Sequence, residues 1–163
     1  INDISAGRDE NIISIAAENN LYICIMHMQN NPENMQNDPR YNNVTKDIFN
    51  YLKEKMTLCI NYGVEKDKII IDPGFGFGKS LDHNYTLLKN LDKFSALSNN
   101  ILIGISRKSM IGNLLDKSVD DRLEGSLAAA TISLVNKASI IRTHDVLETK
   151  IVSNAIKRII DAA

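Results

Sequence analysis

The sequence predicts an α/β fold, and within that class a (β/α)8 TIM barrel of which the chain carries only the later βα units. Short runs of β-branched residues alternate with segments of helical periodicity, a pattern typical of parallel strands joined by right-handed crossovers. Polar side chains follow each run, and only a closed barrel brings all such strand ends to one face. A complete barrel needs roughly 250 residues. We therefore expect residues 1–163 to form the carboxyl-terminal part of a single barrel domain.

The strands are predicted at residues 21–26, 68–72, 101–105 and 139–142, and residues 1–3 resemble the end of an earlier strand. The run at 68–72 is continuously apolar up to its last residue, which favours a strand buried on both faces of a parallel sheet. Each strand ends in polar or reactive side chains, which are in chain order Asn2, His27, Asp72, Ser106 with Lys108, and Arg142 with His144.

Helical periodicity predicts helices at residues 10–19, 45–62, 81–91, 121–136 and 146–160. His83 and Asn84 open the third of these, and acidic residues favour the start of the fourth. We interpret the charges of residues 120–124 as structural. Small side chains at 125–130 suit close packing on the sheet or on another subunit. The polar connection 29–43 contains Asn-Pro and Asp-Pro turn signals, and connections of this length are often functional.

Composition excludes several functional classes. The net charge is −1 and the hydrophobic content is 44%, so no basic field favours a nucleic-acid partner. No apolar run approaches the ~20 residues of a membrane span. Cys24 and Cys59 fall in a predicted strand and a predicted helix without metal-ligand spacing. We therefore expect reduced thiols in a cytoplasmic protein. No metal cluster, cysteine nucleophile or serine triad is apparent in the sequence.

The most informative segment is the strand at 68–72 with the loop that follows it. The apolar run stops at Asp72, after which Pro73 and three alternating glycines force an irregular loop. The glycine spacing fits neither a P-loop, which needs glycine at the position of Pro73, nor a dinucleotide fingerprint, which needs glycine at the position of Lys79. A carboxylate at the carboxyl end of a buried parallel strand is typical of an active site. Its burial requires a neutralising partner or a ligand.

Two partners for Asp72 are possible. A planar donor edge, either a guanidinium or a heterocycle with adjacent N–H and NH₂ groups, would match the carboxylate. The alternative is an ion pair with Lys108 or Arg142. Phe75 and Phe77 either form an aromatic wall for a flat ligand or anchor the loop.

The remaining strand ends predict a locally basic mouth that favours an anionic substrate. Arg142 and His144 are two residues apart and share a face, as do Ser106 and Lys108 if the strand continues. Arg107 and Lys79 would add positive charge. We interpret His27, between two methionines, as a hydrogen-bonded structural residue.

Five segments together resemble the dihydropteroate synthase family, the folate-pathway transferases inhibited by sulfonamides. The matching segments occur in the family's order and span nearly the whole chain: residues 1–5 (INDIS), 25–29 (IMHMQ), 72–79 (DPGFGFGK), 104–109 (GISRKS) and 142–146 (RTHDV). The resemblance implies a (β/α)8 barrel that condenses 6-hydroxymethyl-7,8-dihydropterin diphosphate with 4-aminobenzoate. The products are 7,8-dihydropteroate and diphosphate.

The resemblance also implies a role for each site residue. Asn2, Asp72 and Lys108 would bind the pterin, with Met26 and Ile4 lining its pocket. Arg142 and His144 would hold the diphosphate and, with Lys108, carry the catalysis. Ser106, Phe77 and Arg107 would form the aminobenzoate site. The implied cofactor is magnesium (Mg²⁺), whose contacts in the family come from a loop for which no residue of this sequence can substitute. The family is usually a homodimer through its late helices.

Two alternatives stay open on the sequence. One is another pterin-binding barrel, such as a methyltetrahydrofolate methyltransferase, although a methyl transfer releases no diphosphate and gives Arg142 and His144 no task. The other is an inactive truncated module that binds a pterin or only assembles.

Overall fold

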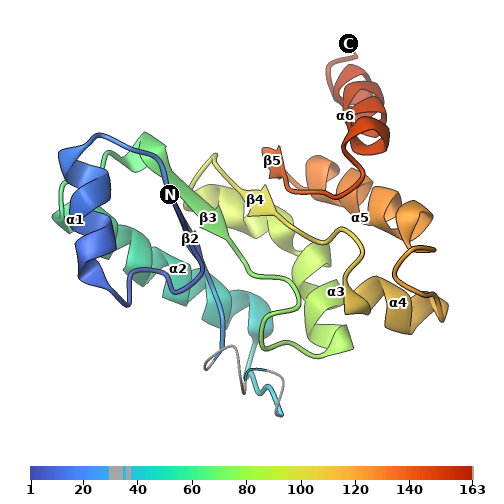
Figure 1. Cartoon of the computed structure of the whole chain (residues 1–163), viewed down its shortest axis with the longest axis horizontal. Helices are drawn as coiled ribbons and strands as arrows, with labels where there is room; N and C mark the ends of the chain where they lie inside the picture. The colour runs from blue at the N-terminus through green and yellow to red at the C-terminus, as the bar shows by residue number, and fades with distance from the viewer. Residues whose placement is uncertain (30–34, 36–37, 163) are drawn as a thin grey trace.

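In the part of the chain that the structure describes, five short parallel strands run through the centre of the molecule (Figure 1). The structure, a computed structural model, describes residues 1–29, 35 and 38–162. In chain order the strands are β1 (Asn2–Asp3), β2 (Ile23–Met26), β3 (Ile69–Asp72), β4 (Leu102–Ile103) and β5 (Ile140–Ile141). The first three form one sheet and the last two another, with a parallel bridge between Ile71 and Ile101. Each strand therefore lies beside the next one in the chain, and within the described part of the chain neither small sheet closes on itself.

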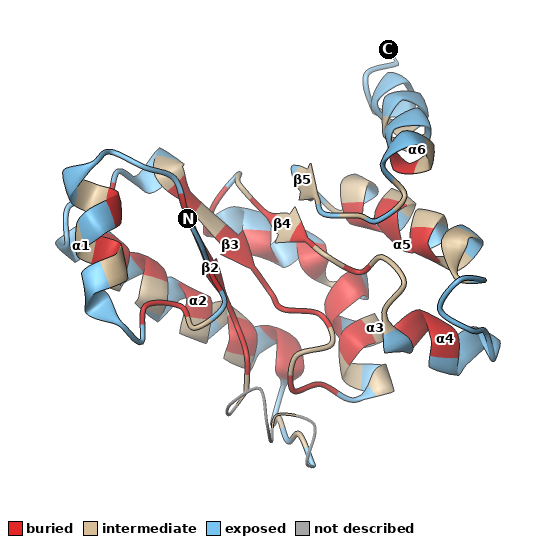
Figure 2. Ribbon diagram, viewed as in Figure 1, coloured by how far each residue is buried: buried red, intermediate tan, exposed pale blue. Residues whose placement is uncertain are grey.

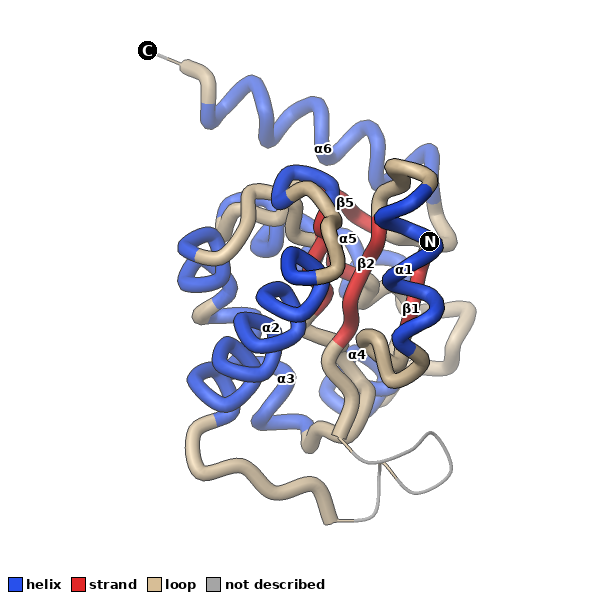
Figure 3. The backbone as a smooth tube through the Cα atoms, turned by 90° about the vertical axis from the view of Figure 1, so that its left-hand side faces the viewer, coloured by secondary structure: helices blue, strands red, loops and turns tan. Residues whose placement is uncertain are grey.

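The helices are α1 (Glu10–Glu18), α2 (Val44–Asn61), α3 (Leu81–Lys89), α4 (Ser109–Leu115), α5 (Leu123–Val135) and α6 (Val146–Ile160), with 3₁₀ turns η1 (Lys66–Lys68) and η2 (Leu91–Ala96). Helices α2, α3 and α5 stand side by side on one face of the strands (Figure 3). The α2 helix begins at Asn43, whose side chain accepts the Lys46 N–H at 3.0 Å. At α3, Ser80 and His83 form a reciprocal capping box.

The predicted elements are confirmed in order and type, with two differences. All four strands are shorter than predicted, and the helix expected at 121–136 begins at Leu123. The second difference is α4, which the periodicity did not predict because it has only seven residues and includes Gly112. The connection predicted at 29–43 lies partly outside the described residues. At its base, Gln29 Nε2 donates to the Arg40 carbonyl at 2.8 Å, and Arg40 N donates back to Gln29 Oε1 at 3.2 Å.

Strand register separates a core face from a polar face. Residues opposite each other in register point to the same side. Ile25 and Ile71 pair in register and are fully buried, as are Ile48 and Leu52 of α2. Burying each such side chain contributes roughly 1.5–3 kcal/mol. Figure 2 shows this buried layer along β2 and β3, whereas α6 is largely exposed.

The alternating positions form the opposite face. Asn2 pairs with Cys24, and Met26 pairs with Asp72, so these four side chains share one side of the sheet. Ile71 bridges to Ile101, and Ile103 pairs with Ile141. By alternation, Arg142 therefore points to the same side of the strands as Asp72. The strand-end residues Asn2, Asp72 and Arg142 are thus on the face that the helices do not cover, whereas His27 is on the opposite face and packs against Tyr51 of α2.

Both cysteines are free and buried, at 3% exposure for Cys24 and none for Cys59. Burial raises the pKa of Cys24 to about 12 and that of Cys59 to about 11. Because only the exposed thiolate reacts rapidly, we expect a maleimide to label neither thiol in the native protein at pH 8. Both should react in guanidinium chloride. A Ser95→Cys variant, exposed on η2, is the positive control and should react at once. Rapid native labelling of the unmodified protein would contradict the packing.

Helices of the described residues are all too short or too polar to cross a membrane.

Candidate functional site

The candidate site begins at Asp72, the last residue of β3. Its side chain is only 8% exposed, and one oxygen, Oδ1, accepts the Gly74 N–H at 2.7 Å. Burial raises the pKa of the Asp72 carboxyl, an effect opposed by Gly74 and by the charges of Lys108, Lys79 and Arg142. Among the described residues no other group donates to this carboxylate. Its second oxygen has no donor among these residues and Oδ1 keeps a second lone pair, so both oxygens can accept from a ligand with two adjacent donors.

The ion pair considered as an alternative does not form. Lys108 and Arg142 act on Asp72 through their charge, but neither is among the ion pairs of the described ranges. Asp72 is thus a buried, partly hydrogen-bonded acid with positive charge nearby. This is the environment in which a planar N–H donor edge would be bound strongly.

Lys108 extends from the loop after β4 towards the glycine loop. Its ammonium donates to the Phe75 carbonyl and lies 4.5 Å from the centre of the Phe77 ring. Burial lowers the pKa of Lys108 to about 8. The two phenylalanines divide the roles predicted for them: Phe75 is 1% exposed and anchors the loop in the core, whereas Phe77 is half-buried beside Lys108. Phe77 is therefore the ring that a ligand could contact.

Lys79 corrects one prediction. It was expected at the basic mouth, but it is 4% exposed and lies beneath the glycine loop. Its ammonium donates to the carbonyls of Gly74 at 2.7 Å and Phe77 at 3.0 Å, and it lies 3.1 Å from His27 Nδ1. The loop turns back over its own carboxyl end, so Lys79 points inward.

His27 is structural, as predicted. It is 7% exposed, contacts Lys79, and packs edge-on against Tyr51 with ring centres 4.9 Å apart. Burial and the neighbouring Lys79 lower the pKa of His27 to about 3. The folded state therefore keeps this ring neutral.

The lowered pKa of His27 predicts a loss of stability in acid. The unfolded ring takes up a proton near pH 6.5 and the folded ring near pH 3, so stability is complete above pH 6.5 and falls as the pH drops between these values. From pH 7 to pH 5 the expected loss is about 2 kcal/mol in the free energy of unfolding. Urea titrations should show this loss in the wild type and not in His27→Gln.

The matched control for this prediction is His83→Gln. Glutamine at position 83 can still complete the capping box of α3, so this variant should retain the wild-type pH dependence. An equal pH dependence in the wild type and in His27→Gln would contradict the assignment.

A second part of the site lies between the ends of β4 and β5. A cavity of about 340 Å³ is lined by Gly104, Ser106, Arg107, Lys108, Arg142 and His144 among others. Ser106 Oγ accepts the backbone N–H of His144 at 3.1 Å and lies 3.0 Å from its ring Nδ1. This pairing joins two loops that are 38 residues apart in the chain. Arg142 and His144 are exposed, so both side chains are accessible to an anion.

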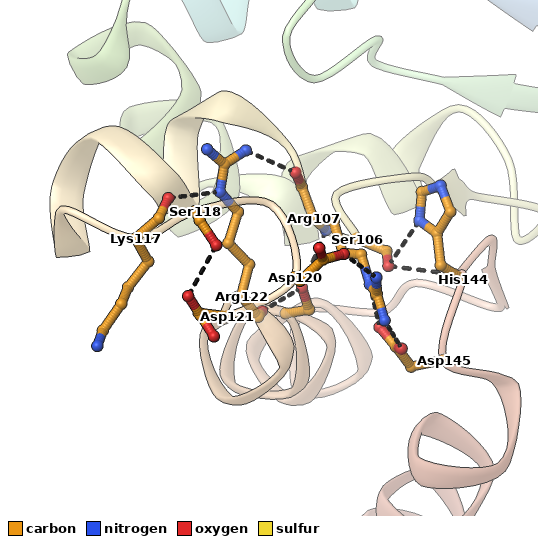
Figure 4. Close-up of polar contacts among 10 residues, drawn as sticks. Ser106, Arg107, Lys117, Ser118, Asp120, Asp121, Arg122, His144 and Asp145 are labelled. Atoms are coloured by element: carbon orange, nitrogen blue, oxygen red, sulfur yellow. Dashed lines mark hydrogen bonds and ion pairs between the residues drawn. The ribbon is translucent and has the colours of Figure 1, made fainter.

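Arg107 is held by two acids that the sequence did not pair with it (Figure 4). Its guanidinium forms a bidentate pair with Asp145, at 3.1 Å and 2.5 Å, and lies 3.4 Å from Asp120. The Arg107 carbonyl accepts from Arg122 at 2.9 Å. Arg107 also adopts the left-handed conformation, with φ of 56°, and its N–H is held by Ser126 at 2.9 Å. Its charge is thus neutralised at the cavity wall.

Asp145 could have been recognised from its place at the start of a predicted helix, directly after His144. Asp120 and Arg122 have the structural role predicted for the charges of residues 120–124, because both hold Arg107 in place.

The structure therefore brings most predicted site residues to one end of the strands. Asn2, Met26, Asp72 and Arg142 share the open face by register, and Ser106, Arg107, Lys108 and His144 line the cavity beside it. Ile4 follows β1 and is 43% exposed.

The described residues of this site do not form a metal centre by themselves. Over the described ranges, no three or more His, Cys, Asp or Glu side chains are grouped so that they could hold a metal ion. We therefore assign no step of the chemistry below to Mg²⁺.

A parallel strand array with a buried acid and an arginine–histidine pair at its strand ends is typical of a ligand-binding site in an α/β protein. The chain belongs to the family of pterin binding enzymes, whose model matches residues 1–144.

Several curated relatives of this chain are dihydropteroate synthases. The enzyme of Haemophilus influenzae is 47% identical over 149 residues, which cover 91% of this chain and 54% of that protein. The structure of the Yersinia pestis enzyme with a sulfonamide drug has a TM-score of 0.96 and 40% identity, covering 99% of this chain and 59% of its own.

The Xanthomonas albilineans enzyme was solved with 7,8-dihydropteroate and with 4-aminobenzoic acid. These structures have TM-scores of 0.91 and identities of 30% and 31%, and they cover the whole of this chain and 60% and 58% of their own. The chain spans about half the length of the curated relatives it matches.

Proposed function

We propose that the protein is a dihydropteroate synthase, a transferase that condenses 6-hydroxymethyl-7,8-dihydropterin diphosphate with 4-aminobenzoate. The observation that carries this proposal is the Asp72 carboxylate, buried at a strand end with one oxygen fixed by Gly74 and the other available. The ligands of the Xanthomonas albilineans structures, a pterin product and the aminobenzoate, support it.

The residues then take the following roles. Asp72 accepts the adjacent N–H and NH₂ groups of the pterin ring, Lys108 donates to the ring carbonyl and N5, and Asn2 adds a further hydrogen bond. Met26 and Ile4 line the apolar sides of the ring. Phe77, Ser106 and Arg107 border the aminobenzoate. Arg142 and His144 bind the diphosphate.

We propose a dissociative mechanism. The bond between the pterin methylene carbon and the diphosphate oxygen breaks first, and the aniline nitrogen then attacks the resulting cation and loses its proton. The energetic demand is the negative charge that develops on the leaving group. Exposed Arg142 and His144, beside the cavity, supply donors for that charge. Arg107, whose charge is paired with Asp145, does not compete with these two residues for the diphosphate.

The barrel, the metal and the assembly are further proposals. The sequential order of five parallel strands supports a (β/α)8 barrel of which this chain forms the later units, since an open doubly wound sheet reverses its order. Mg²⁺ would require ligands other than the described residues. A homodimer through the late helices is supported by exposed apolar side chains on α4 and α5, including Leu114 and Ile132. We place the enzyme in the cytoplasm, in keeping with its free thiols.

The test is incorporation of radiolabelled 4-aminobenzoate into dihydropteroate by the full-length protein. We expect incorporation that requires the pterin diphosphate and releases one diphosphate for each product. Methyl transfer from methyltetrahydrofolate without incorporation would instead identify the related methyltransferase. Calorimetric binding of the pterin diphosphate without either reaction would identify a binding module.

A further inference from the structure

Lys79 is the most deeply buried cation at the strand ends, and the proposed reaction assigns it no task. Its three contacts are the carbonyls of Gly74 and Phe77 and the ring nitrogen Nδ1 of His27. The first two belong to the glycine loop, whereas His27 follows β2. One side chain thus ties the loop after β3 to the end of the neighbouring strand.

Lys79 is linked to Asp72 through one residue, Gly74. The Gly74 carbonyl accepts from Lys79 at 2.7 Å, and the Gly74 N–H donates to Asp72 Oδ1 at 2.7 Å. Gly74 is therefore held from both sides, in the left-handed conformation with φ of 71°. Fixing Gly74 fixes which oxygen of Asp72 is occupied and which is available to a ligand.

Burying the charged Lys79 ammonium at this position costs free energy. Burial lowers the pKa of Lys79 to about 7, although Asp72 raises it. A methionine would fill similar space without that cost, but two carbonyl groups would lose a donor. A neutral amine still has two N–H groups for these carbonyls and could accept from His27 Nδ1, so either protonation state maintains the tie. The charged groups that face it are Asp72 and Lys108.

We propose that Lys79 is a positioning residue that acts through Gly74 on the Asp72 carboxylate, and thereby sets the affinity of the site for the planar donor edge of a pterin. The inference rests on the proposed function for the identity of the ligand. It deepens that function, because Lys79 would touch neither substrate.

A double-mutant cycle tests this inference in the full-length protein. Lys79→Met, Asp72→Asn and the double variant are compared by calorimetric affinity for 6-hydroxymethyl-7,8-dihydropterin diphosphate. We expect Lys79→Met to weaken binding about tenfold alone, and much less in the Asp72→Asn background, because the group through which it acts is already altered. Lys66→Met, an exposed lysine of η1, should leave the affinity unchanged. Equal losses in both backgrounds, or no loss at all, would overturn the proposal.

A readout without ligand separates this inference from the proposed function. The ¹³C carboxyl signal of Asp72, titrated by NMR in the free protein, should show a higher pKa in Lys79→Met than in the wild type, because a nearby positive charge and a held donor are lost. An unchanged Asp72 pKa would overturn the inference even if the wild type binds the pterin. If the wild type binds no pterin but the Asp72 pKa rises, the proposed function fails and the positioning role stands. Lys79→Leu, which likewise removes both the donors and the charge, replaces Lys79→Met in both measurements if the methionine variant does not fold, with the same expected outcomes.

Discussion

Replacing Gly74 by alanine is expected to destabilise the protein by roughly 2–5 kcal/mol and to abolish pterin binding. An added Cβ would lie 1.9 Å from the backbone oxygen of His27, which belongs to the strand end and cannot rotate away. The residue also has φ of 71°, which an alanine adopts only with strain. Relief of the clash would move Gly74 off both Asp72 and Lys79, so that stability and binding are lost together.

The matched control is Gly63→Ala. Gly63 has φ of 94°, but an added Cβ would meet only Ala17 Cβ at 3.9 Å. This variant should lose only the free energy that the left-handed conformation costs an alanine, about 1–2 kcal/mol. It should bind the pterin diphosphate normally. Urea unfolding gives the first quantity and calorimetry the second. If the two glycine variants were equally stable, the close approach of Gly74 to His27 would be contradicted.

Strand and helix order could be predicted because each element carries its own local pattern. Ile69–Asp72 is continuously apolar and ends in an acid, and Val146–Ile160 has a helical period over its whole length. The element that was missed, α4, is too short to show a period. It is capped by Asp116, which follows Leu115 in the left-handed conformation with φ of 51°, so no glycine marks its end in the sequence.

The candidate site was predictable to the extent that strand ends determine it. Parallel strands place their carboxyl ends together, so Asp72, Lys108 and Arg142 could be grouped from spacing alone. The direction of a side chain in an irregular loop has no such rule. Lys79 was therefore placed at the mouth, whereas the left-handed glycines of the loop turn it inward. The pairing of Arg107 with Asp145, 38 residues further on, depends on packing between two loops.

Changing Asp72 to asparagine is expected to separate binding from stability. The asparagine amide cannot serve as a charged acceptor for two adjacent donors, so pterin affinity should fall by about 1–3 kcal/mol, roughly 5- to 150-fold. The free energy of unfolding, by contrast, should not fall. Burial raises the pKa of the Asp72 carboxyl, so this group favours the folded state while it is protonated in acid, and that contribution is lost as the carboxyl ionises with rising pH. At pH 7 the neutral asparagine should be at least as stable as the wild type.

Calorimetry with the pterin diphosphate and urea unfolding at pH 7 measure the two effects of Asp72→Asn. Asp92→Asn, an exposed acid on η2, is the control and should change neither. Substituting a residue that served only the fold would lower the free energy of unfolding and would weaken pterin binding in proportion. If the carboxylate instead serves the ligand and destabilises the folded chain, its replacement should weaken pterin binding without lowering the free energy of unfolding. Loss of stability in Asp72→Asn with unchanged pterin affinity would therefore remove Asp72 from the site.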